Sequence, residues 1–282
     1  MEIEFENVSY TYNYKTPLRK VALRDIDLIF KTGKINCLLG KSGSGKTTLI
    51  ELINALLEPT KGKITIDEFT LKKGVKIKNI NDLRFNIGLI FQFPEEQIFC
   101  NTVYKEITFG MRYFNYKKDD LYNRAKQSLA MVGLGEEYLK RDPYTLSRGE
   151  MRKVAIASVL AYNPKVLIFD EPTVGLDDIA KTNFTKLLKT LKEKFNKTII
   201  LVTHDVDMVY EVADYIYVLQ SGEVVIQGDK YKVFNHKLLN EYGIRTPKVL
   251  NFIHMAKKLK GIKLMQRDNI NDLIKDVYRN VK

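Results

Sequence analysis

The stretch KINCLLGKSGSGKTTLIELINALL at residues 34–57 decides the fold. An apolar run of strand length at 34–40 enters a loop rich in Gly and Ser, and apolar residues at helical spacing follow at 47–57. The loop, GKSGSGKTT at 40–48, matches a phosphate-binding pattern in which glycines let the backbone wrap around an anion at a helix N-terminus. The alternative is a chance loop of Gly and Ser, and the strand before it and the helix after it argue against that.

Each residue of this loop has an expected part in holding a nucleotide. Backbone N–H groups form a nest for phosphate, Lys46 adds a point charge at the β- and γ-phosphates, and the Thr47 hydroxyl is placed to bind Mg²⁺. The expected nucleotide-binding residues of the loop are Gly40, Lys41, Ser42, Gly43, Ser44, Gly45, Lys46, Thr47 and Thr48.

Length and charge narrow the class of protein. The 282 residues suit one large domain, or one domain with a small appendage. Lys and Arg number 46 against 34 Asp and Glu, a net charge of +12, but the lysines are spread along the chain. We therefore expect a generally positive surface, suited to work beside anionic lipid, and no nucleic-acid partner. No apolar run approaches the roughly 18 residues of a membrane span, and the N-terminus shows no secretory signal.

Cysteine usage indicates a reduced, cytoplasmic setting. Cys37 and Cys100 are too few for a disulfide framework, and their spacing to the three histidines indicates no zinc site. Cys37 lies within an apolar run, so we expect it to be a small buried residue.

The order of expected elements predicts an α/β fold. Strands alternate with helices, which favours a mostly parallel sheet with helices on both faces. A block at 102–160 reads mostly as helices and interrupts the alternation, so we expect a helical subdomain, at about 96–160, within a main domain at 1–240. Strands are expected at 2–12, 22–30, 34–40, 62–67, 86–92, 165–172 and 197–204, a hairpin at 215–228, and further helices at 180–194 and 205–213.

The last part of the chain, 241–282, is expected to be a helical extension. A helix at 246–259 is predicted with Thr246 as its cap and Pro247 at its first position, and a second helix at 268–281. The apolar face predicted for the first helix consists of Val249, Phe252, Ile253, Ala256 and Leu259.

Polar side chains end three of the apolar strands. Asp170 and Glu171 follow VLIF at 166–169, and we expect Asp170 to hold Mg²⁺ and Glu171 to act as general base beside the attacking water. His204 closes ILVTH and is expected to hydrogen-bond the γ-phosphate and that water. Gln92, after LIF, is expected to reach both Mg²⁺ and the water. Judged singly, solvated acids, a structural histidine and an exposed loop glutamine remain alternatives.

Taken together, these motifs resemble an ABC-type ATPase. GKSGSGKT, a Gln after an apolar strand, LSRGE, VLIFDEP, GLDD and LVTHD occur in the order and spacing of that family over residues 1 to about 230. The resemblance implies a RecA-like P-loop core with N-terminal antiparallel strands. It also implies that Tyr12 stacks on adenine, a role for which Tyr10 competes, and that Asp177 lies at a dimer contact and touches the partner's phosphate loop.

The segment LSRGE at 146–150 corresponds to the family's signature, in which Arg148 stands where glycine is usual and Glu150 where glutamine is usual. The resemblance implies that Ser147 and Gly149 face a γ-phosphate held by the other subunit. Arg148 is positive and need not repel phosphate, whereas Glu150 brings negative charge close to it. We interpret the segment as a working but atypical signature, with a weakened composite site as the alternative, and infer a different, related ATPase as partner.

A closer resemblance is to the ATPases of energy-coupling factor (ECF) transporters, and within them to the second ATPase type. It is carried by FQFPEEQIFCNTVYKEITFG at 91–110, MRKVAIASVLA at 151–161 and the tail around 246–264. It implies an ATP-hydrolysing subunit that powers an importer of vitamins or metal ions from the cytoplasmic face of the cell membrane. The implied partners are a second ABC ATPase, a transmembrane coupling protein and a substrate-binding membrane subunit.

Two other functions are considered. The chain could serve another kind of ABC transporter, which its membrane partners would reveal. It could instead be a non-transport ABC ATPase acting on DNA or ribosomes, although the sequence shows no coiled-coil insertion, zinc module or second ATPase domain.

Overall fold

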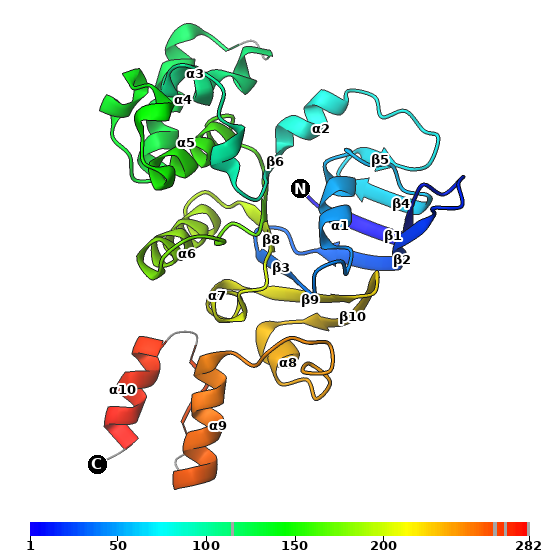
Figure 1. The fold of residues 1–282 in the computed structure, drawn as a ribbon, viewed down its shortest axis with the longest axis vertical. Helices are drawn as coiled ribbons and strands as arrows, with labels where there is room; N and C mark the ends of the chain where they lie inside the picture. Colours follow the sequence, from blue (N-terminus) through cyan, green and yellow to red (C-terminus); the bar gives the residue numbers. More distant parts are fainter. Residues whose placement is uncertain (114–115, 262–263, 268–269, 281–282) are drawn as a thin grey trace.

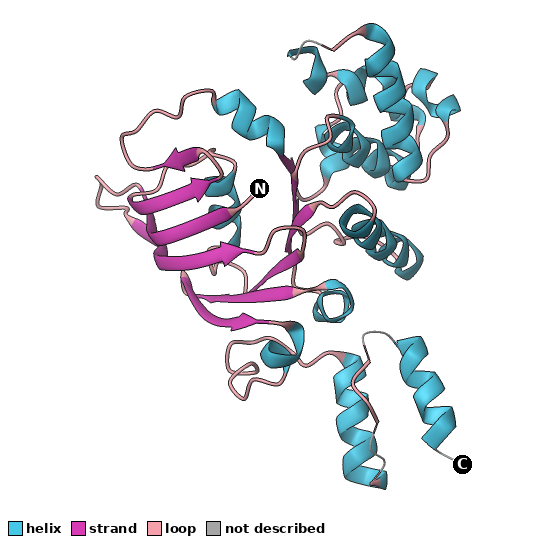
Figure 2. Ribbon diagram, turned by 180° about the vertical axis from the view of Figure 1, so that it is seen from behind, coloured by secondary structure: helices cyan, strands magenta, loops and turns pink. Residues whose placement is uncertain are grey.

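The computed structural model describes residues 1–113, 116–261, 264–267 and 270–280. Two β-sheets form its centre, with helices around them (Figures 1 and 2). The smaller sheet is antiparallel, with strand order β2-β1-β4-β5. It buries alternate residues of β1, such as Ile3 and Phe5, as a sheet covered on one face does. Its strands are β1 Ile3–Tyr12, β2 Lys20–Phe30, β4 Lys61–Ile66 and β5 Phe69–Leu71.

The larger sheet has the strand order β10-β9-β3-β8-β7-β6, and every neighbouring pair except β9 and β10 is parallel. Every residue of β3, β7 and β8 is buried, which explains why these strands read as unbroken apolar runs. Its strands are β3 Ile35–Leu39, β6 Ile87–Ile90, β7 Val166–Asp170, β8 Thr198–Val202, β9 Tyr215–Gln220 and β10 Glu223–Gly228.

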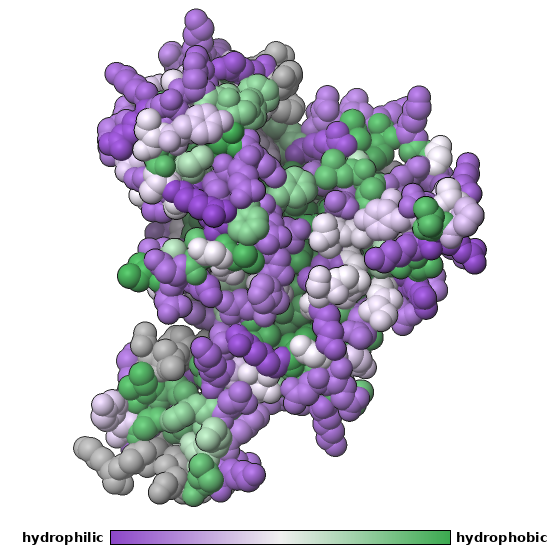
Figure 3. Space-filling view, in the orientation of Figure 1, coloured by the Kyte–Doolittle hydropathy of each residue, from purple (hydrophilic) through white to green (hydrophobic). Residues whose placement is uncertain are grey.

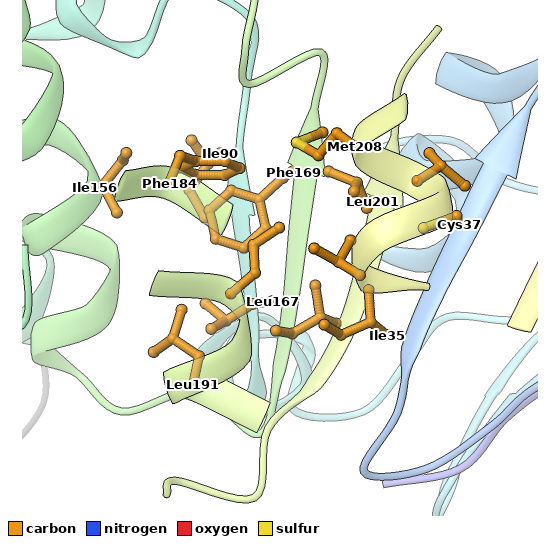
Figure 4. Close-up of a cluster of buried hydrophobic side chains, with 14 of the residues drawn as sticks. Ile35, Cys37, Ile90, Ile156, Leu167, Phe169, Phe184, Leu191, Leu201 and Met208 are labelled. Carbon is orange, nitrogen blue, oxygen red and sulfur yellow. The ribbon is translucent and has the colours of Figure 1, made fainter. Parts of the chain in front are cut away.

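Helices cover both faces of the larger sheet (Figure 2). On one face, α1 (Lys46–Ile53) packs in a core shared by the two sheets. On the other face lie α6 (Asp178–Glu193) and α7 (Val206–Val212), where Phe169 meets Phe184 edge to face with ring centroids 5.3 Å apart (Figure 4). The parallel strands are therefore held in place from both sides.

A group of helices between β6 and β7 packs beside the sheets (Figure 1). Its longest members, α4 and α5, pack on each other and on α3 through residues of the same hydrophobic core. The boundary predicted for this helical subdomain stays a prediction. The helices of the segment are α3 Val103–Thr108, α4 Lys118–Met131 and α5 Arg148–Ala161, with 3-10 turns η1 Pro94–Gln97, η2 Gly110–Tyr113, η3 Glu136–Lys140 and η4 Pro143–Thr145.

The C-terminal part contains α8 (Lys230–Phe234), α9 (Lys248–Lys260) and α10 (Ile270–Asn280). Figure 3 shows apolar side chains on the surface of this part of the molecule. Exposed apolar residues there include Phe252, Met255, Leu259, Met265, Ile274 and Tyr278. No helix among the described residues combines the length and apolar character that crossing a bilayer requires.

The start of α9 differs from the prediction. Pro247, not Thr246, occupies the cap position, and no side chain caps the helix. The buried face differs from the predicted apolar face, because Leu250 and Ile253 are buried whereas Phe252 and Leu259, both assigned to the apolar face, are exposed. Leu250, Ile253 and partly buried Val249 belong to the core or pack against it, so the predicted apolar stripe is wider than the part of α9 that is buried. Of the helix predicted at 268–281, residues 268, 269 and 281 lie outside the described residues.

Other expected elements are found with small differences. Helix α1 ends at Ile53, short of the predicted 57, because Asn54 caps it and Ala55 turns into the left-handed region with φ 51°. The hairpin turns at Ser221 and Gly222 as predicted. The short strand β5 and helix α2 (Ile80–Asn86) were not anticipated, because neither has a clear apolar period of its own.

Candidate functional site

Four loops at one edge of the larger sheet define the site. Because β3, β6, β7 and β8 are parallel, their carboxyl ends lie at the same edge, where α/β proteins bind ligands. The phosphate loop follows β3, and a cleft of about 900 Å³ is lined by this loop and by residues at the ends of the other strands. The residues that the other three strand ends bring into the cleft are Gln92, Asp170, Glu171 and His204.

The phosphate loop depends on glycine for its path. Gly45 has φ 108°, and a Cβ there would lie 2.7 Å from the carbonyl oxygen of Ala22; a Cβ at Gly40 would collide with the carbonyl oxygen of Leu219. Larger residues would therefore push the loop away from the neighbouring strands. Gly45 is also the N-cap of α1, and no side chain caps that helix end. The first N–H groups of α1 are thus left to an anion.

The polar groups of the loop fit a phosphate ligand. Lys46 is largely buried, and its Nζ donates to the carbonyl oxygens of Gly40 at 2.8 Å and Lys41 at 3.0 Å. Burial lowers the pKa of Lys46, with the charges of Glu171 and Asp170 opposing the shift. Buried Ser44 Oγ has no hydrogen-bond partner among the described residues. The Lys46 ammonium group and the buried Ser44 hydroxyl could both donate hydrogen bonds to an anion. An anionic ligand would therefore satisfy these polar groups.

Asp170 and Glu171 sit in different environments. Asp170 ends the buried strand β7, and burial, followed by the charge of Glu171, raises the pKa of its carboxyl to about 6, against the lowering effects of Lys46 and the Thr47 hydroxyl. Glu171 adopts a left-handed backbone with φ 46° and donates its N–H to Val202 at 2.8 Å. This conformation is costly for a non-glycine residue and is over-represented at functional sites.

His204 points its ring at Glu171. The distance between His204 Nδ1 and Glu171 Oε2 is 2.8 Å, and the His204 side chain is 73% exposed. Both residues line the cleft, so the structure brings together the expected general base and the expected γ-phosphate contact.

The two candidate adenine-stacking tyrosines have different surroundings. Tyr12 lines the cleft, and its hydroxyl lies 3.0 Å from Thr48 Oγ1 on α1. Tyr10 packs against the core and meets Tyr12 edge to face, with ring centroids 4.8 Å apart. This arrangement favours Tyr12, and its contact with adenine stays a prediction.

The signature residues lie outside this cleft. Ser147, Gly149 and Asp177 line a separate groove of about 660 Å³ between α5 and α6. Ser147 caps α5, and its hydroxyl contacts Glu150 Oε2 at 2.7 Å while its N–H donates to the same oxygen at 2.9 Å. Asp177 caps α6, accepting from the N–H of Ala180 at 2.7 Å. Within one chain, these residues do not meet the phosphate loop's cleft.

Glu150 forms part of a capping box. Besides Ser147, the Tyr138 hydroxyl donates to its Oε1 at 2.6 Å. These hydrogen bonds, with that of Tyr138 the largest cause, lower the pKa of Glu150 to about 2. The carboxylate is thus ionised and committed to its own helix end. The unusual residue therefore has a structural part in the signature that the sequence did not reveal.

Arg148 and Arg152 hold a buried carboxylate that the sequence analysis missed. Glu95, in the turn after Gln92, is 4% exposed; its Oε1 lies 2.9 Å from Arg148 Nε and its Oε2 2.9 Å from Arg152 Nε. Burial raises the pKa of Glu95, but its own backbone hydrogen bond and the two guanidinium groups outweigh burial and lower it overall. The Gln92 loop is thereby tied to the first two turns of α5, the helix that begins in the signature. No local pattern shows this, because the partners lie 53 and 57 positions apart.

The segment before α9 also lines the cleft, which was not predicted. Gly243, Ile244 and Arg245, from the segment before α9, line it together with the phosphate loop. They belong to no motif, so their place at the cleft could not be predicted from the sequence.

Comparisons with known proteins agree with this geometry. The family model described as "ABC transporter" matches residues 23–174, more than half of the chain. The chain is 45% identical to the energy-coupling factor transporter ATP-binding protein EcfA2 of Spiroplasma kunkelii, over 94% of this chain and 87% of that protein. It is 42% identical to the protein of the same name from Streptococcus agalactiae, over 94% of each chain.

Solved structures share the fold. CbiO1 from Clostridium perfringens, part of the ABC transporter complex CbiONQ, is 33% identical with a TM-score of 0.74, over 89% of this chain and 98% of that one. The ATP-binding cassette MJ0796, solved as a dimer in a post-hydrolysis state with ADP and Pi, is 30% identical with a TM-score of 0.71, over 80% and 98%.

The chain therefore belongs to the ABC transporter family, and within that family to the ATP-binding proteins of energy-coupling factor transporters. The predicted P-loop ABC ATPase fold and ATP-hydrolase activity are confirmed.

Proposed function

We propose that this chain is one of two ATP-hydrolysing subunits that power a membrane importer of the energy-coupling factor type, for vitamins or metal ions. The observation that carries the proposal is the convergence of the phosphate loop, Gln92, Asp170, Glu171 and His204 on one cleft. The similarity to ATP-binding proteins of that class, which extends over 94% of the chain, supports it.

ATP binds with its phosphates in the loop 40–48 and its adenine against Tyr12. The loop offers backbone N–H groups, Lys46 and the unpaired Ser44 hydroxyl to the phosphates. Mg²⁺ is the metal that these residues would accept, through Thr47, Gln92 and Asp170, because it prefers oxygen ligands shared with substrate phosphate. When bound, it would neutralise phosphate charge.

Hydrolysis uses groups already in place in the cleft. Glu171 takes a proton from the attacking water, and its contact with His204 at 2.8 Å fixes the carboxylate. His204 then shares its ring between Glu171 and the terminal phosphate. The positive φ of Glu171 holds this side chain where an ordinary strand end would not.

A second, related ABC ATPase completes each site. Ser147, Gly149 and Asp177 lie in their own groove, away from the cleft of the same chain, so they serve a nucleotide held by another subunit. The cassette MJ0796, solved as a dimer with ADP and Pi, supports this pairing. The atypical Arg148 and Glu150 favour a partner of different sequence, so that the two composite sites differ.

The transmembrane coupling protein docks beside the Gln92 loop. An apolar groove of about 210 Å³ is lined there by Phe91, Pro94, Phe99, Phe109 and Tyr162, among others. Phe99 is 59% exposed and packs edge to face on Phe109. A helix of the coupling protein covers these rings at the cytoplasmic face of the membrane, and a separate membrane subunit binds the solute.

We further propose that the chain is divided into a domain, a subdomain within it and a C-terminal extension. Residues 1–240 form the ABC ATPase domain, in which about 96–160 form the helical subdomain that contacts the membrane partner. Residues 241–282 form the C-terminal extension.

The test is co-purification of the tagged chain from membranes. We expect a second ABC ATPase, a common coupling protein and a small substrate-binding membrane protein, with ATP hydrolysis in the complex. Phe99→Asp should lose the membrane partners and keep ATP binding, because it places a charge in the docking groove. Phe195→Asp, at a partly exposed ring outside that groove, is the matched control. Recovery of nucleic acid or ribosomes in place of membrane proteins would contradict the proposal.

A further inference from the structure

The C-terminal extension reaches the nucleotide cleft through a fixed turn. Gly243 donates its N–H to the Asn240 carbonyl at 2.9 Å, and Ile244 donates to the Leu239 carbonyl at 3.2 Å. Ile244 is only 5% exposed and belongs to the main hydrophobic core. The segment is thus anchored at the cleft by burial and backbone hydrogen bonds, and is not a loose linker to α9.

This turn touches the phosphate loop directly. Gly243 has φ 74°, and a Cβ there would collide with Lys41 Cε and lie 2.9 Å from Lys41 Nζ. The end of the Lys41 side chain therefore packs against the Gly243 backbone, in space that a larger residue would fill. The carbonyl oxygen of Lys41 also accepts from Lys46 Nζ. The extension thus contacts a residue that positions the phosphate-binding lysine.

Asp207 of α7 orients Arg245, the next residue but one after Gly243. Its Nη2 lies 3.2 Å from Asp207 Oδ2, and Asp207 Oδ1 accepts the N–H of Lys248 at 2.7 Å. Asp207 stands in the first turn of α7, which begins two residues after His204. The Arg245 side chain nevertheless remains 64% exposed and lines the cleft. One carboxylate thus orients a guanidinium that has five N–H donors in all.

We propose that Arg245 binds the terminal phosphate of the nucleotide held by its own subunit, so that the C-terminal extension completes the site. This inference rests on the proposed nucleotide function of the cleft. Arg245 follows the turn in which Gly243 contacts Lys41, and its partner Asp207 stands three residues after His204. Lys41 and His204 are expected phosphate contacts, whereas Tyr12, the expected adenine contact, belongs to the antiparallel sheet. A planar guanidinium held from one side by a carboxylate is suited to binding phosphate oxygens with its other donors.

The test compares a non-hydrolysable ATP analogue with ADP, titrated into the purified complex that contains the full-length chain. Arg245→Gln keeps a donor for Asp207 but removes the charge. We expect it to weaken binding of the ATP analogue about tenfold, the worth of one charge-assisted hydrogen bond, and that of ADP less than about twofold. Arg245→Lys, which keeps the charge without the fork, should recover part of the loss.

Arg267→Gln is the matched control. Arg267 lies in the same extension and pairs with Asp276 at 2.6 Å, but it does not line the cleft. It should leave both affinities unchanged. Thermal unfolding without nucleotide checks that each variant is folded.

Equal losses for the ATP analogue and ADP, or no loss for either, would overturn the assignment of Arg245 to the terminal phosphate. Failure of the unmodified complex to bind either nucleotide would instead overturn the proposed function of the cleft itself.

Discussion

Two regions satisfy their polar groups in opposite ways: the cleft lined by the phosphate loop, and the signature region around Ser147 and Glu150. In the cleft, burial shifts the pKa of Lys46 downward and that of Asp170 upward, and Ser44 Oγ has no partner within the described part of the chain. In the signature region, Ser147 and Glu150 bond each other, and hydrogen bonds lower the pKa of Glu150. The cleft is thus incomplete by itself, whereas the signature is complete within its own chain.

The proposed function accounts for this difference by the place where each region would meet its ligand. A cleft that takes nucleotide from solution has its charges and hydroxyls arranged before the ligand arrives, at a cost in desolvation. A signature that serves another subunit must be stable while that subunit is absent, so its polar groups bond to their own helix. In the proposed composite site, Ser147 would exchange its bond with Glu150 for one to phosphate.

The largest expected effect tests the cleft. Glu171→Gln should reduce ATP turnover about a thousandfold, because loss of general-base catalysis costs two to four orders of magnitude, while binding of a non-hydrolysable ATP analogue changes little. Both quantities are measured in the full complex. Glu223→Gln, at an exposed position on β10, should change neither. Unchanged hydrolysis in Glu171→Gln would remove this residue from the mechanism.

The next effect concerns binding. Lys46→Ala should weaken ATP binding about a hundredfold, because it removes a buried charge that pairs with phosphate and leaves the loop carbonyls without their donor. Titration of the purified complex with the ATP analogue measures it. Lys189→Ala on α6, which breaks the pair with Glu211 and lies outside the cleft's lining, is the control. Retained affinity would contradict the assignment of the loop.

A comparable effect, on stability in place of binding, is expected where the two regions are joined. Glu95→Gln leaves buried Arg152 without its carboxylate, so the free energy of unfolding should fall by about 3 kcal/mol. Glu96→Gln is a matched control, because Glu96 pairs with Arg148 at the surface and should cost less than about 0.5 kcal/mol. Urea unfolding of both variants measures the loss of unfolding free energy. Equal losses would show that the buried pair of Glu95 and Arg152 adds no more stability than the surface pair of Glu96 and Arg148.

The sequence predicted the cleft better than the signature region, for a physical reason. The phosphate loop, Asp170, Glu171 and His204 each follow a buried apolar strand, and parallel strands bring their carboxyl ends together whatever the rest of the chain does. The role of Glu150 needed Tyr138, and that of Arg148 needed Glu95, across distances at which no periodicity operates.

The C-terminal part shows the same limit. The apolar spacing of α9 predicts a helix, and the helix is present. Which residues it buries depends on the surface against which it packs, so Leu250 is inside while Phe252 is not. The approach of Gly243 to Lys41 likewise depends on how the whole chain returns to the cleft.

The smallest expected effect is a dependence of stability on pH that comes from Asp170. Asp170 has a pKa near 6 in the folded protein, above its ordinary value of 3.8, because burial disfavours its charge. The folded state therefore binds more protons than the unfolded state between about pH 4 and 6, so this residue's contribution to stability falls as pH rises through that window and stays low above it. Asp170→Asn lacks this titration.

Without nucleotide, the unfolding free energy of Asp170→Asn relative to the unmodified protein should therefore rise by about 2 kcal/mol from pH 4 to pH 7. Denaturant unfolding at a series of pH values measures the difference, in which titrating groups that do not interact with Asp170 cancel. Glu150→Gln should show no such rise, because hydrogen bonds lower the pKa of Glu150 to about 2, below its ordinary value of 4.5, so that this residue's contribution to stability increases as pH rises. A flat difference for Asp170→Asn would mean that the cleft carries no uncompensated charge, and the contrast between the two regions would then be lost.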